Sequence, residues 1–560
     1  MNKFWMKRQQ WKYPLILFLI FISVIGLSLP KGALYGSTTD WYSQHAALAE
    51  TIRTACLEQK TLLPKYLDLG GGSNGFLFSY YGYLRPDIVL GCLFPQVPMQ
   101  YFVMGYMLIG YFVSVLLFYR LLLAEKMPNF QAFLGSALFL LSTCFFQTHR
   151  QVMFINYMPF LIAAFLLIKK KKYCWIPLLL SLIYCNSFYY AIAVLASIGW
   201  YWYREEGIAF FKHYIKSTLL SIGMTAALLI PTGLVILEHK RSGTGPEGIF
   251  AFHWDFASLL YSPYGMGLTA ICLYTLFLGL SSKRYRVDSL FYLFLTGSGL
   301  AAYVLNGFLY ARSKILIPFV PLFLLHCVRI FRELQTKKLT WRFWPFLPLL
   351  GVLACYRKSE LFLVLIADCL IIFFVLLVNK YFPQRNIALL ILLILPACAF
   401  LKTADTEKYV SLAQVEDIGV ETSFHRNTGL AQVYAKESSP ISVKTSKFSL
   451  ALQNDLYRFD SIYEPLSTGN RDASSNRKKS TMYSSITDES YRQVYYDLLM
   501  TPIQINNRIA LLAADNPFLL YFMGVRYLET SSEHIPDGYR ILKREGNRVI
   551  AENENVLPLA

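Results

Sequence analysis

The feature that most constrains this chain is the way its apolar residues are grouped. Up to about residue 403 they form blocks of roughly 16–22 residues, and beyond that position the blocks stop. A helix needs about 20 apolar residues to cross the hydrocarbon core of a bilayer. We therefore predict a polytopic α-helical membrane domain over residues 1–403, followed by a water-soluble domain over residues 404–560.

We expect about 13 transmembrane helices. Their approximate ranges are 13–29, 99–121, 130–147, 152–168, 173–186, 188–203, 217–237, 267–281, 288–309, 315–331, 343–356, 361–378 and 386–402. The first range follows Lys3, Lys7, Arg8 and Lys12 and is similar to a signal peptide. Because the apolar run is long and no small-x-small cleavage site precedes Pro30, we expect an uncleaved signal anchor.

The composition supports a membrane protein and indicates its orientation. Only 16% of the residues are charged, whereas soluble proteins carry roughly a quarter. Much of the excess behind the net charge of +18 lies in short tethers between apolar blocks, which is typical of cytoplasmic loops and argues against nucleic-acid binding. The N-terminus is therefore predicted to be cytoplasmic. An odd number of spans then places residues 404–560 outside the cell membrane.

Three polar regions are expected on the outer side. Two of them are long loops, at about 30–98 and 238–266, and loops of this length are usually functional or disordered. Their aromatic content argues against disorder. The third is the C-terminal domain, for which we predict a mixed α/β fold with a strand-like run from Phe518 to Met523 and a helix from about Asp488 to Leu499.

Asp40 is the first candidate for chemistry, since it lies shortly after the first span. A carboxylate at that place can accept the proton of a sugar hydroxyl during its attack. The position also suits the N-cap of a helix predicted from Trp41 to Cys56. Both interpretations stay open on position alone.

Basic residues near the outer ends of spans are candidates for holding a lipid phosphate. They are Arg85, His149, Arg150, Arg312 and Lys314. Arginine offers bidentate geometry to a phosphate and lysine a point charge. Ordinary snorkelling to lipid headgroups is the alternative for each of them. Arg312 and Lys314 stand out because two cations flank a short loop on the side where few are expected.

Two further features leave alternatives open. Asp368 lies in the middle of a predicted span, where a carboxylate is either functional or a hydrogen-bonded contact between helices. Cys56 and Cys92 share the first outer loop and are either a disulfide or two free thiols. The glycine-rich run at 70–75 lacks the Gly-Lys-Ser/Thr of a phosphate loop, so a flexible loop is the better interpretation.

Several short patterns, in order along nearly the whole chain, resemble the bacterial YfhO family of membrane proteins. They are Asp40 to Gln44 after the first span, Leu69 to Gly75, Tyr80 to Asp87, Asn156 to Pro159, Tyr483 to Ser485 with Tyr491, Leu519 to Leu528, and Glu552 to Pro558. Two departures are visible. His45 stands where the family commonly has an aromatic residue, and the chain stops at Ala560 where family chains usually run on, so we expect a short or truncated member.

The resemblance implies a GT-C-type glycosyltransferase fold with a catalytic aspartate in the first outer loop, which falls on Asp40. It also implies a polyprenyl-phosphate sugar, such as one on undecaprenyl phosphate, as donor. The implied acceptor is a cell-envelope glycopolymer such as lipoteichoic acid, modified outside the cytoplasmic membrane. The expected donor-phosphate ligands are Arg312, Lys314, Arg150 and Arg85, and the expected substrate contacts are Gln44, Tyr80, Tyr81 and His253.

No metal site is assigned, because one outer carboxylate near the membrane does not make one, although a divalent cation could also neutralise the phosphate. Two other classes of function remain as alternatives. The first is a transporter or flippase of a lipid-linked glycan, but such proteins tend to carry internal repeats and none is visible here. The second is a non-enzymatic envelope assembly protein whose outer domain binds a partner.

Overall fold

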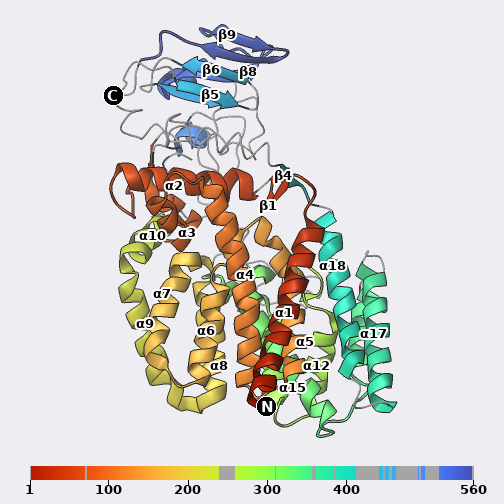
Figure 1. Ribbon diagram of the computed structural model, residues 1–560. Coiled ribbons are helices and arrows are strands. Elements are labelled where there is room, and N and C mark those ends of the chain that lie inside the picture. Colours follow the sequence, from red (N-terminus) through yellow and green to blue (C-terminus); the bar gives the residue numbers. More distant parts are fainter. Residues whose placement is uncertain are drawn as a thin grey trace.

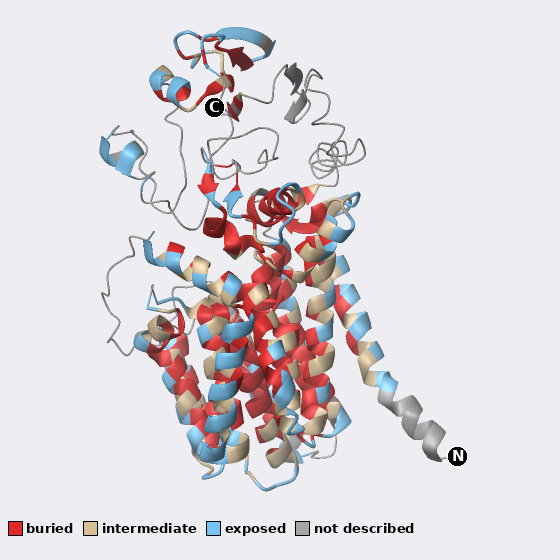
Figure 2. Ribbon diagram, turned by 90° about the vertical axis from the view of Figure 1, so that its left-hand side faces the viewer, coloured by how far each residue is buried: buried red, intermediate tan, exposed pale blue. Residues whose placement is uncertain are grey.

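The computed structural model describes residues 2–38, 40–67, 69, 72–238, 259–308, 311–355, 361–381, 386–405, 407–411, 441–445, 448–452, 457–461, 490, 493–498 and 516–557. A tall helix bundle carries strands above one of its ends, and the N-terminus lies at the other end (Figure 1). Buried residues are concentrated along the centre of the bundle (Figure 2). We call the end nearer the strands the upper end and the other the lower end.

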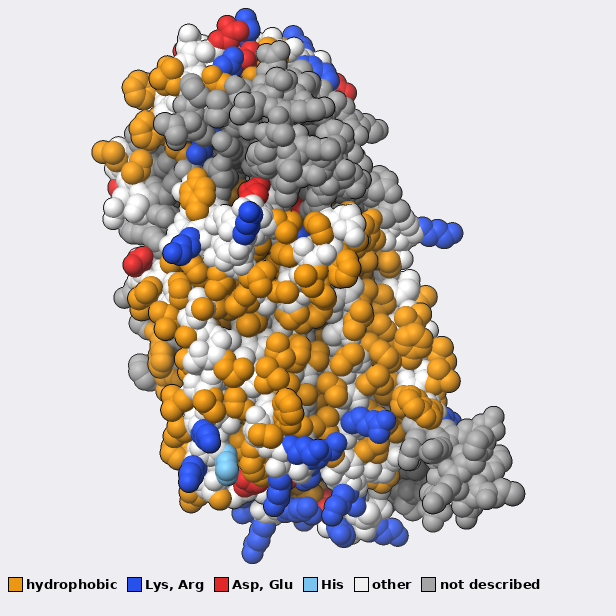
Figure 3. Space-filling model, turned by 60° about the vertical axis from the view of Figure 1, so that its left-hand side comes forward, with side chains coloured by type: hydrophobic (Ala, Val, Ile, Leu, Met, Phe, Trp, Pro, Cys, Tyr) orange, Lys and Arg blue, Asp and Glu red, His pale blue; other side chains and the backbone are white. Residues whose placement is uncertain are grey.

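Helices lie in each of the predicted apolar ranges. They are α1 (Asn2–Ser28), α4 (Met99–Ala124), α5 (Asn129–Leu140), α6 (Met158–Lys169), α7 (Ile176–Ser187), α8 (Ala191–Glu206), α9 (Phe210–Met224), α10 (Ala226–Glu238), α12 (Ala270–Leu280), α13 (Arg286–Gly297), α14 (Gly299–Leu305), α15 (Val320–Gln335), α16 (Phe346–Cys355), α17 (Leu361–Tyr381) and α18 (Ile394–Asp405). Apolar residues cover the middle of the face in Figure 3, whereas Lys and Arg gather at its lower end.

Not every helix is long enough to cross a bilayer unaided. Among the described residues, five helical stretches have the required length and hydropathy. The number becomes six if α5 and the following 3-10 helix η3 (Thr143–His149), which bend by 49°, count as one broken span. The protein is therefore helical and membrane-like, and the count of thirteen spans stays a prediction.

The segment between α1 and α4, predicted as the first outer loop, is folded across the upper end of the bundle. It consists of β1 (Ala33–Ser37), the π-helix η1 (Trp41–Ala46), α2 (Ala47–Glu58), β2 (Tyr66–Leu67), β3 (Ser73–Asn74), the 3-10 helix η2 (Gly75–Tyr81) and α3 (Pro86–Leu93). The predicted helix from Trp41 to Cys56 is confirmed as η1 followed by α2. In Figure 1, α2 lies crosswise between the bundle and the C-terminal strands.

A buried ion pair holds this segment to the bundle. The Arg53 guanidinium lies 2.5 Å from Glu50, and their side chains are only 0% and 5% exposed. Arg53 also donates to the carbonyl of Val97 at 2.6 Å, and Glu50 accepts the backbone N–H of Met99, the first residue of α4, at 3.2 Å. Buried charges must be paired and hydrogen-bonded to be tolerated. The pair therefore ties α2 to the start of α4.

The described C-terminal residues form strands and short helices. β4 (Tyr409–Ser411) pairs antiparallel with β1, and β5 (Ile441–Thr445) forms a hairpin with β6 (Phe448–Leu452). β7 (Arg458–Ser461), β8 (Val525–Ser531), β10 (Arg548–Glu552) and β9 (Arg540–Glu545) follow one another, in that order, in a four-stranded sheet. Within the range predicted as a helix around 488–499, the described residues include the helical segment η11 (Gln493–Leu498).

The predicted strand from Phe518 to Met523 is wrong, because these residues lie in or directly after helix α22 (Pro517–Phe522). Asn516 accepts hydrogen bonds from the N–H groups of Phe518 at 3.0 Å and Leu519 at 3.4 Å. Asparagine at the N-cap followed by proline at the first helical position starts a helix. This local signal outweighs the β propensity of the apolar run.

The two alternatives left open by the sequence are decided by contacts. Asp368 is 3% exposed, and its carboxylate accepts the N–H of Ala270 at 2.5 Å and the hydroxyl of Tyr261. It is therefore a contact between helices, at the start of α12. Cys56 and Cys92 are free thiols whose side chains hydrogen-bond to each other.

We predict that Glu50→Gln lowers the free energy of unfolding by about 3 kcal/mol, because the change leaves the buried Arg53 charge without its counter-ion. Denaturant unfolding in detergent measures this. Replacing both residues by apolar ones of similar size is expected to cost less than the single change. Lys65→Gln, which removes an exposed charge from the same segment, is the control and is expected to unfold like the wild type. An equal loss in both single variants would contradict the assignment.

Candidate active site

Asp40 lies between β1 and η1, at the upper end of the bundle. Its side chain makes no capping hydrogen bond to the described residues of the helix that follows. Instead, Oδ1 accepts from the Nε2 of Gln44 at 2.9 Å, and Oδ2 accepts from the Nε2 of Gln151 at 3.2 Å. Both donors are neutral amides, so they orient the carboxylate without cancelling its charge. Asp40 therefore occupies the N-cap position of η1 without capping it through its side chain, and its carboxylate is bound by two amides instead.

The Gln44 amide is itself oriented by its neighbours. The Tyr81 hydroxyl donates to Gln44 Oε1 at 3.2 Å, and both side chains are buried. An amide whose oxygen accepts this bond must present its nitrogen to Asp40. Tyr81, Gln44 and Asp40 thus form a hydrogen-bonded series that fixes one side of the carboxylate.

His45 fills the place of an aromatic residue. Its ring packs against Tyr81 with centroids 5.7 Å apart. Burial, with a smaller contribution from the charge of Arg85, lowers the pKa of His45 to about 3. The ring is therefore neutral at neutral pH and packs as an uncharged aromatic group. This accounts for the departure from the family pattern noted in the sequence.

Arg85 is not placed to bind a donor phosphate. Its side chain is 1% exposed and forms a bidentate pair with Asp87, at 2.6 Å and 2.8 Å. A third nitrogen donates to the carbonyl of Tyr81 at 3.1 Å. Its donors are directed to protein oxygens, so the structure gives Arg85 a positioning role beneath Tyr81 and does not support the predicted role in phosphate binding.

Tyr80 and Lys314 lie beside a second group of packed side chains. The Tyr80 hydroxyl donates to the sulfur of Met153, and its ring stands edge-on to Tyr189 at 6.2 Å. Lys314, in the 3-10 helix η8 (Ser313–Phe319), places Nζ 5.0 Å from the Tyr189 ring and 5.9 Å from the Phe154 ring. A cation over an aromatic face gains about 0.5–2 kcal/mol. The contacts hold the Lys314 ammonium against this group.

One short segment contacts both Asp40 and Lys314. Gln151 contacts Asp40, and Phe154 contacts Lys314, at either side of the 3-10 helix η4 (Val152–Phe154). The Oε1 atom of Gln151 is buried and has no hydrogen-bond partner among the described residues. A buried acceptor of this kind needs a partner, and a hydroxyl of a bound molecule or a water would satisfy it. Gln151 could not be singled out from the sequence, because 111 residues separate it from Asp40.

Arg150 and His149 face the C-terminal part of the chain. Glu407 Oε2 lies 3.2 Å from the Nε of Arg150 and 3.2 Å from the Nε2 of His149. The hydrogen bonds and charges of these two partners outweigh the opposing effect of burial and lower the pKa of Glu407. Arg150 also donates to the hydroxyl of Tyr264. Arg150 directly precedes Gln151 in the sequence and forms an ion pair with Glu407.

Two further predicted site residues are Arg312 and His253. Arg312 is exposed and lies two residues before Lys314 on extended backbone. His253 lies outside the described residues. No group of three or more His, Cys, Asp or Glu side chains in the described part of the chain is placed to hold a metal ion.

We predict that acid destabilises the protein through His45. A folded-state pKa of about 3, against about 6.5 when unfolded, means that the unfolded state binds more protons between these values, so stability falls as the pH drops below about 6.5. From pH 7 to 4.5 the loss is about 2–3 kcal/mol. Unfolding experiments at both pH values should show that His45→Gln reduces this loss. The exposed His213→Gln is expected to keep it; equal pH dependence in all three proteins would contradict the assignment.

Comparisons with known proteins show which structures this chain resembles. A search of curated proteins finds no match. Arabinofuranosyltransferase AftD from Mycobacteria is similar in structure, with a TM-score of 0.51 and 12% identity over 97% of this chain and 40% of that one. ArnT from Cupriavidus metallidurans gives 0.49 and 10% over 98% of each chain. The oligosaccharyltransferase AglB from Archaeoglobus fulgidus, in complex with an inhibitory peptide and a dolichol-phosphate, gives 0.46 and 10% over 98% of this chain and 75% of that one.

The likeness to AftD concerns the fold, which is of the GT-C type. The sequence itself gives the family. A family model described as bacterial membrane protein YfhO matches residues 12–560, which is nearly the whole length. The chain belongs to the YfhO family of bacterial membrane proteins.

Proposed function

We propose that this protein is a membrane glycosyltransferase that moves a sugar from a polyprenyl-phosphate donor to a cell-envelope glycopolymer, such as lipoteichoic acid, on the outer face of the membrane. The observation that carries the proposal is the Asp40 carboxylate, oriented by Gln44 and Gln151 and not used to cap its helix. The fold shared with AftD and the family membership support it.

In this proposal Asp40 is the general base. The acceptor hydroxyl oxygen attacks the anomeric carbon of the donor sugar, and its proton passes to an Asp40 oxygen. The bond between the anomeric carbon and the phosphate oxygen breaks, and its electron pair leaves with the polyprenyl phosphate. A base is needed because an alcohol is a weak nucleophile until its proton is accepted. The two amide donors leave the carboxylate charged and oriented for that transfer.

The leaving phosphate needs positive charge nearby. Lys314 is assigned this role, because its ammonium lies on the wall built by Phe154 and Tyr189, near the segment that contacts Asp40. Arg312 lies two residues away and is exposed, so it is assigned to the same phosphate. Arg150 joins them if the donor competes with Glu407 for its guanidinium.

The donor and acceptor sugars are assigned to the region between Asp40 and Lys314. Tyr80 offers a half-buried aromatic face there, while Tyr81 and Gln44 act by holding Asp40. In this arrangement residues 1–403 are the membrane domain and residues 404–560 an extracytoplasmic domain, with the N-terminus in the cytoplasm and about 13 spans. The excess of Lys and Arg at the lower end of the bundle supports this orientation (Figure 3).

We predict that Asp40→Asn lowers the transfer rate by roughly 10²–10⁴-fold, because the amide cannot accept the proton. The assay uses the full chain in proteoliposomes, a polyprenyl-phosphate hexose or N-acetylhexosamine, and lipoteichoic acid as acceptor. Asp405→Asn, which changes an exposed carboxylate at the same end, is the control and should transfer at the wild-type rate. Unchanged transfer by Asp40→Asn would remove Asp40 from the mechanism.

We also predict that Lys314→Gln lowers kcat/KM for the donor by about tenfold or more, since a charge-assisted contact contributes about 1.5–3 kcal/mol. Lys314→Arg should restore part of the loss because it keeps the charge. Lys31→Gln removes an exposed cation from the loop after α1 and serves as the matched control. If Lys314→Gln and Lys31→Gln had the same kinetics, Lys314 would not hold the donor.

A further inference from the structure

A polar cavity of about 390 Å³ lies at the lower end of the bundle, away from Asp40. Helix α4 starts beside α2, at Met99, and Glu125 follows its last residue. Glu125 lines the cavity, together with residues at the ends of α6, α8, α13 and α15. The cavity is therefore separated from the candidate active site by the length of a 26-residue helix.

The walls of the cavity carry more cations than carboxylates. Among the described residues, six basic ones line the cavity, namely Lys169, Arg204, Arg284, Arg329, Arg332 and Lys338. Four described lining residues are acidic, namely Glu125, Glu205, Asp288 and Glu333. The lining therefore has an excess of two positive charges.

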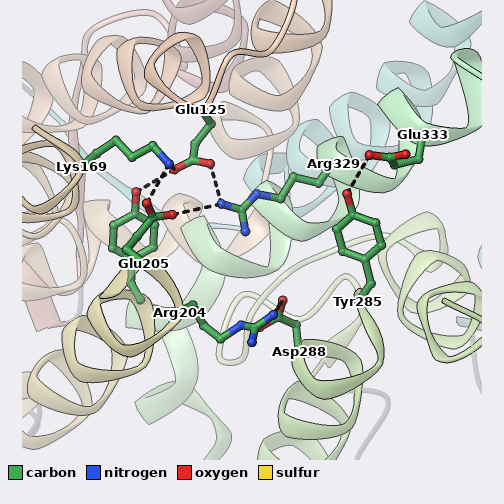
Figure 4. Close-up of polar contacts among 9 residues, drawn as sticks. Glu125, Lys169, Arg204, Glu205, Tyr285, Asp288, Arg329 and Glu333 are labelled. Atoms are coloured by element: carbon green, nitrogen blue, oxygen red, sulfur yellow. Dashed lines mark hydrogen bonds and ion pairs between the residues drawn. The ribbon is translucent and has the colours of Figure 1, made fainter. Parts of the chain in front are cut away.

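All four carboxylates are already paired, as Figure 4 shows in part. Glu125 lies 2.5 Å from Arg329 and 3.0 Å from Lys169, and Lys169 lies 2.7 Å from Glu205. These contacts form one network that joins the lower ends of four helices, α4, α6, α8 and α15.

The other two carboxylates are held in separate pairs. Arg204 lies 2.8 Å from Asp288, and Arg284 lies 3.2 Å from Glu333. This leaves Arg332 and Lys338, whose side chains make no ion pair or hydrogen bond with any described residue. The surplus charge of the cavity therefore resides on these two side chains.

We propose that this cavity binds a phosphate-bearing anion of the kind presented by the headgroup of an anionic membrane lipid. Arginine and lysine together supply a planar donor fork and a mobile point charge, which suit phosphate oxygens. Basic pockets between membrane helices on the cytoplasmic side are suited to such headgroups. The volume lies in the range of roughly 300–1,000 Å³ that is usual for small-ligand sites.

A membrane lipid is favoured as the source by the surface beside the cavity. On α13, Val287, Leu290 and Phe294 are 48%, 54% and 49% exposed, and they share one face at i, i+3 and i+7. This apolar stripe starts one residue before Asp288, which lines the cavity. A lipid whose headgroup occupied the cavity would find an apolar surface for its acyl chains there.

The test measures binding to full-length protein that has been purified in neutral detergent and delipidated. Short-chain phosphatidylglycerol, phosphatidylcholine and inorganic phosphate are titrated in separate arms, and the shift in Tm gives each dissociation constant. Arg332→Gln/Lys338→Gln is expected to weaken phosphatidylglycerol binding by about 25-fold, since each cation near an anionic lipid contributes roughly fivefold. Phosphatidylcholine should bind far more weakly.

The matched control is Lys170→Gln/Lys172→Gln, which removes two exposed cations that do not line the cavity. It should bind phosphatidylglycerol like the wild type. An equal loss in both double variants would show general surface attraction and overturn the proposal, as would wild-type binding by Arg332→Gln/Lys338→Gln. If inorganic phosphate alone binds and only the cavity variant loses it, the anion site stands and its source is a soluble phosphate. Should the double variant aggregate, the exposed Lys338→Gln alone is expected to lose roughly fivefold.

Discussion

The buried contact between Glu50 and Arg53 is the interaction on which the position of the candidate active site depends. It ties α2 to the first residue of α4, which is a long apolar helix of the bundle. The chain enters α2 through η1, and Asp40 immediately precedes η1. A rigid attachment of α2 therefore sets the height of the Asp40 carboxylate above the bundle. Burying either charged group without its partner would strongly destabilise the folded protein.

Carboxylates have different partners at the two ends of the molecule. At the upper end, the Asp40 carboxylate accepts hydrogen bonds from two neutral amides, those of Gln44 and Gln151. At the lower end, Glu125 and Glu205 are each paired with Lys169 and Arg329, so their charge serves to join helices. An amide donor orients a carboxylate and leaves its proton affinity usable. A cation stabilises the ionised form and makes proton uptake harder.

The helices could be predicted from the sequence because apolar length is a local property, and every predicted range contains helix. Asp40 could be singled out, but position alone did not separate a base from an N-cap. That distinction depends on Gln151, which is remote in sequence and reaches Asp40 only in the folded bundle. The rule for outer cations ignored Asp87, two residues from Arg85, which binds its guanidinium, so the predicted phosphate contact of Arg85 has no support from the geometry. The helix α22 was missed because apolar content was weighed above the Asn516 cap.

The C-terminal part of the chain helps to build the site that precedes it. β4 pairs with β1, which ends shortly before Asp40, and the N–H of Thr38 donates to the carbonyl of Lys408 at 3.0 Å. Glu407 holds His149 and Arg150, directly before Gln151, which donates to the carboxylate of Asp40. Residues 407–411 therefore contact both the strand that precedes Asp40 and the residues that precede Gln151. These residues, which lie beyond the predicted boundary near residue 404, thus contribute contacts to the candidate active site.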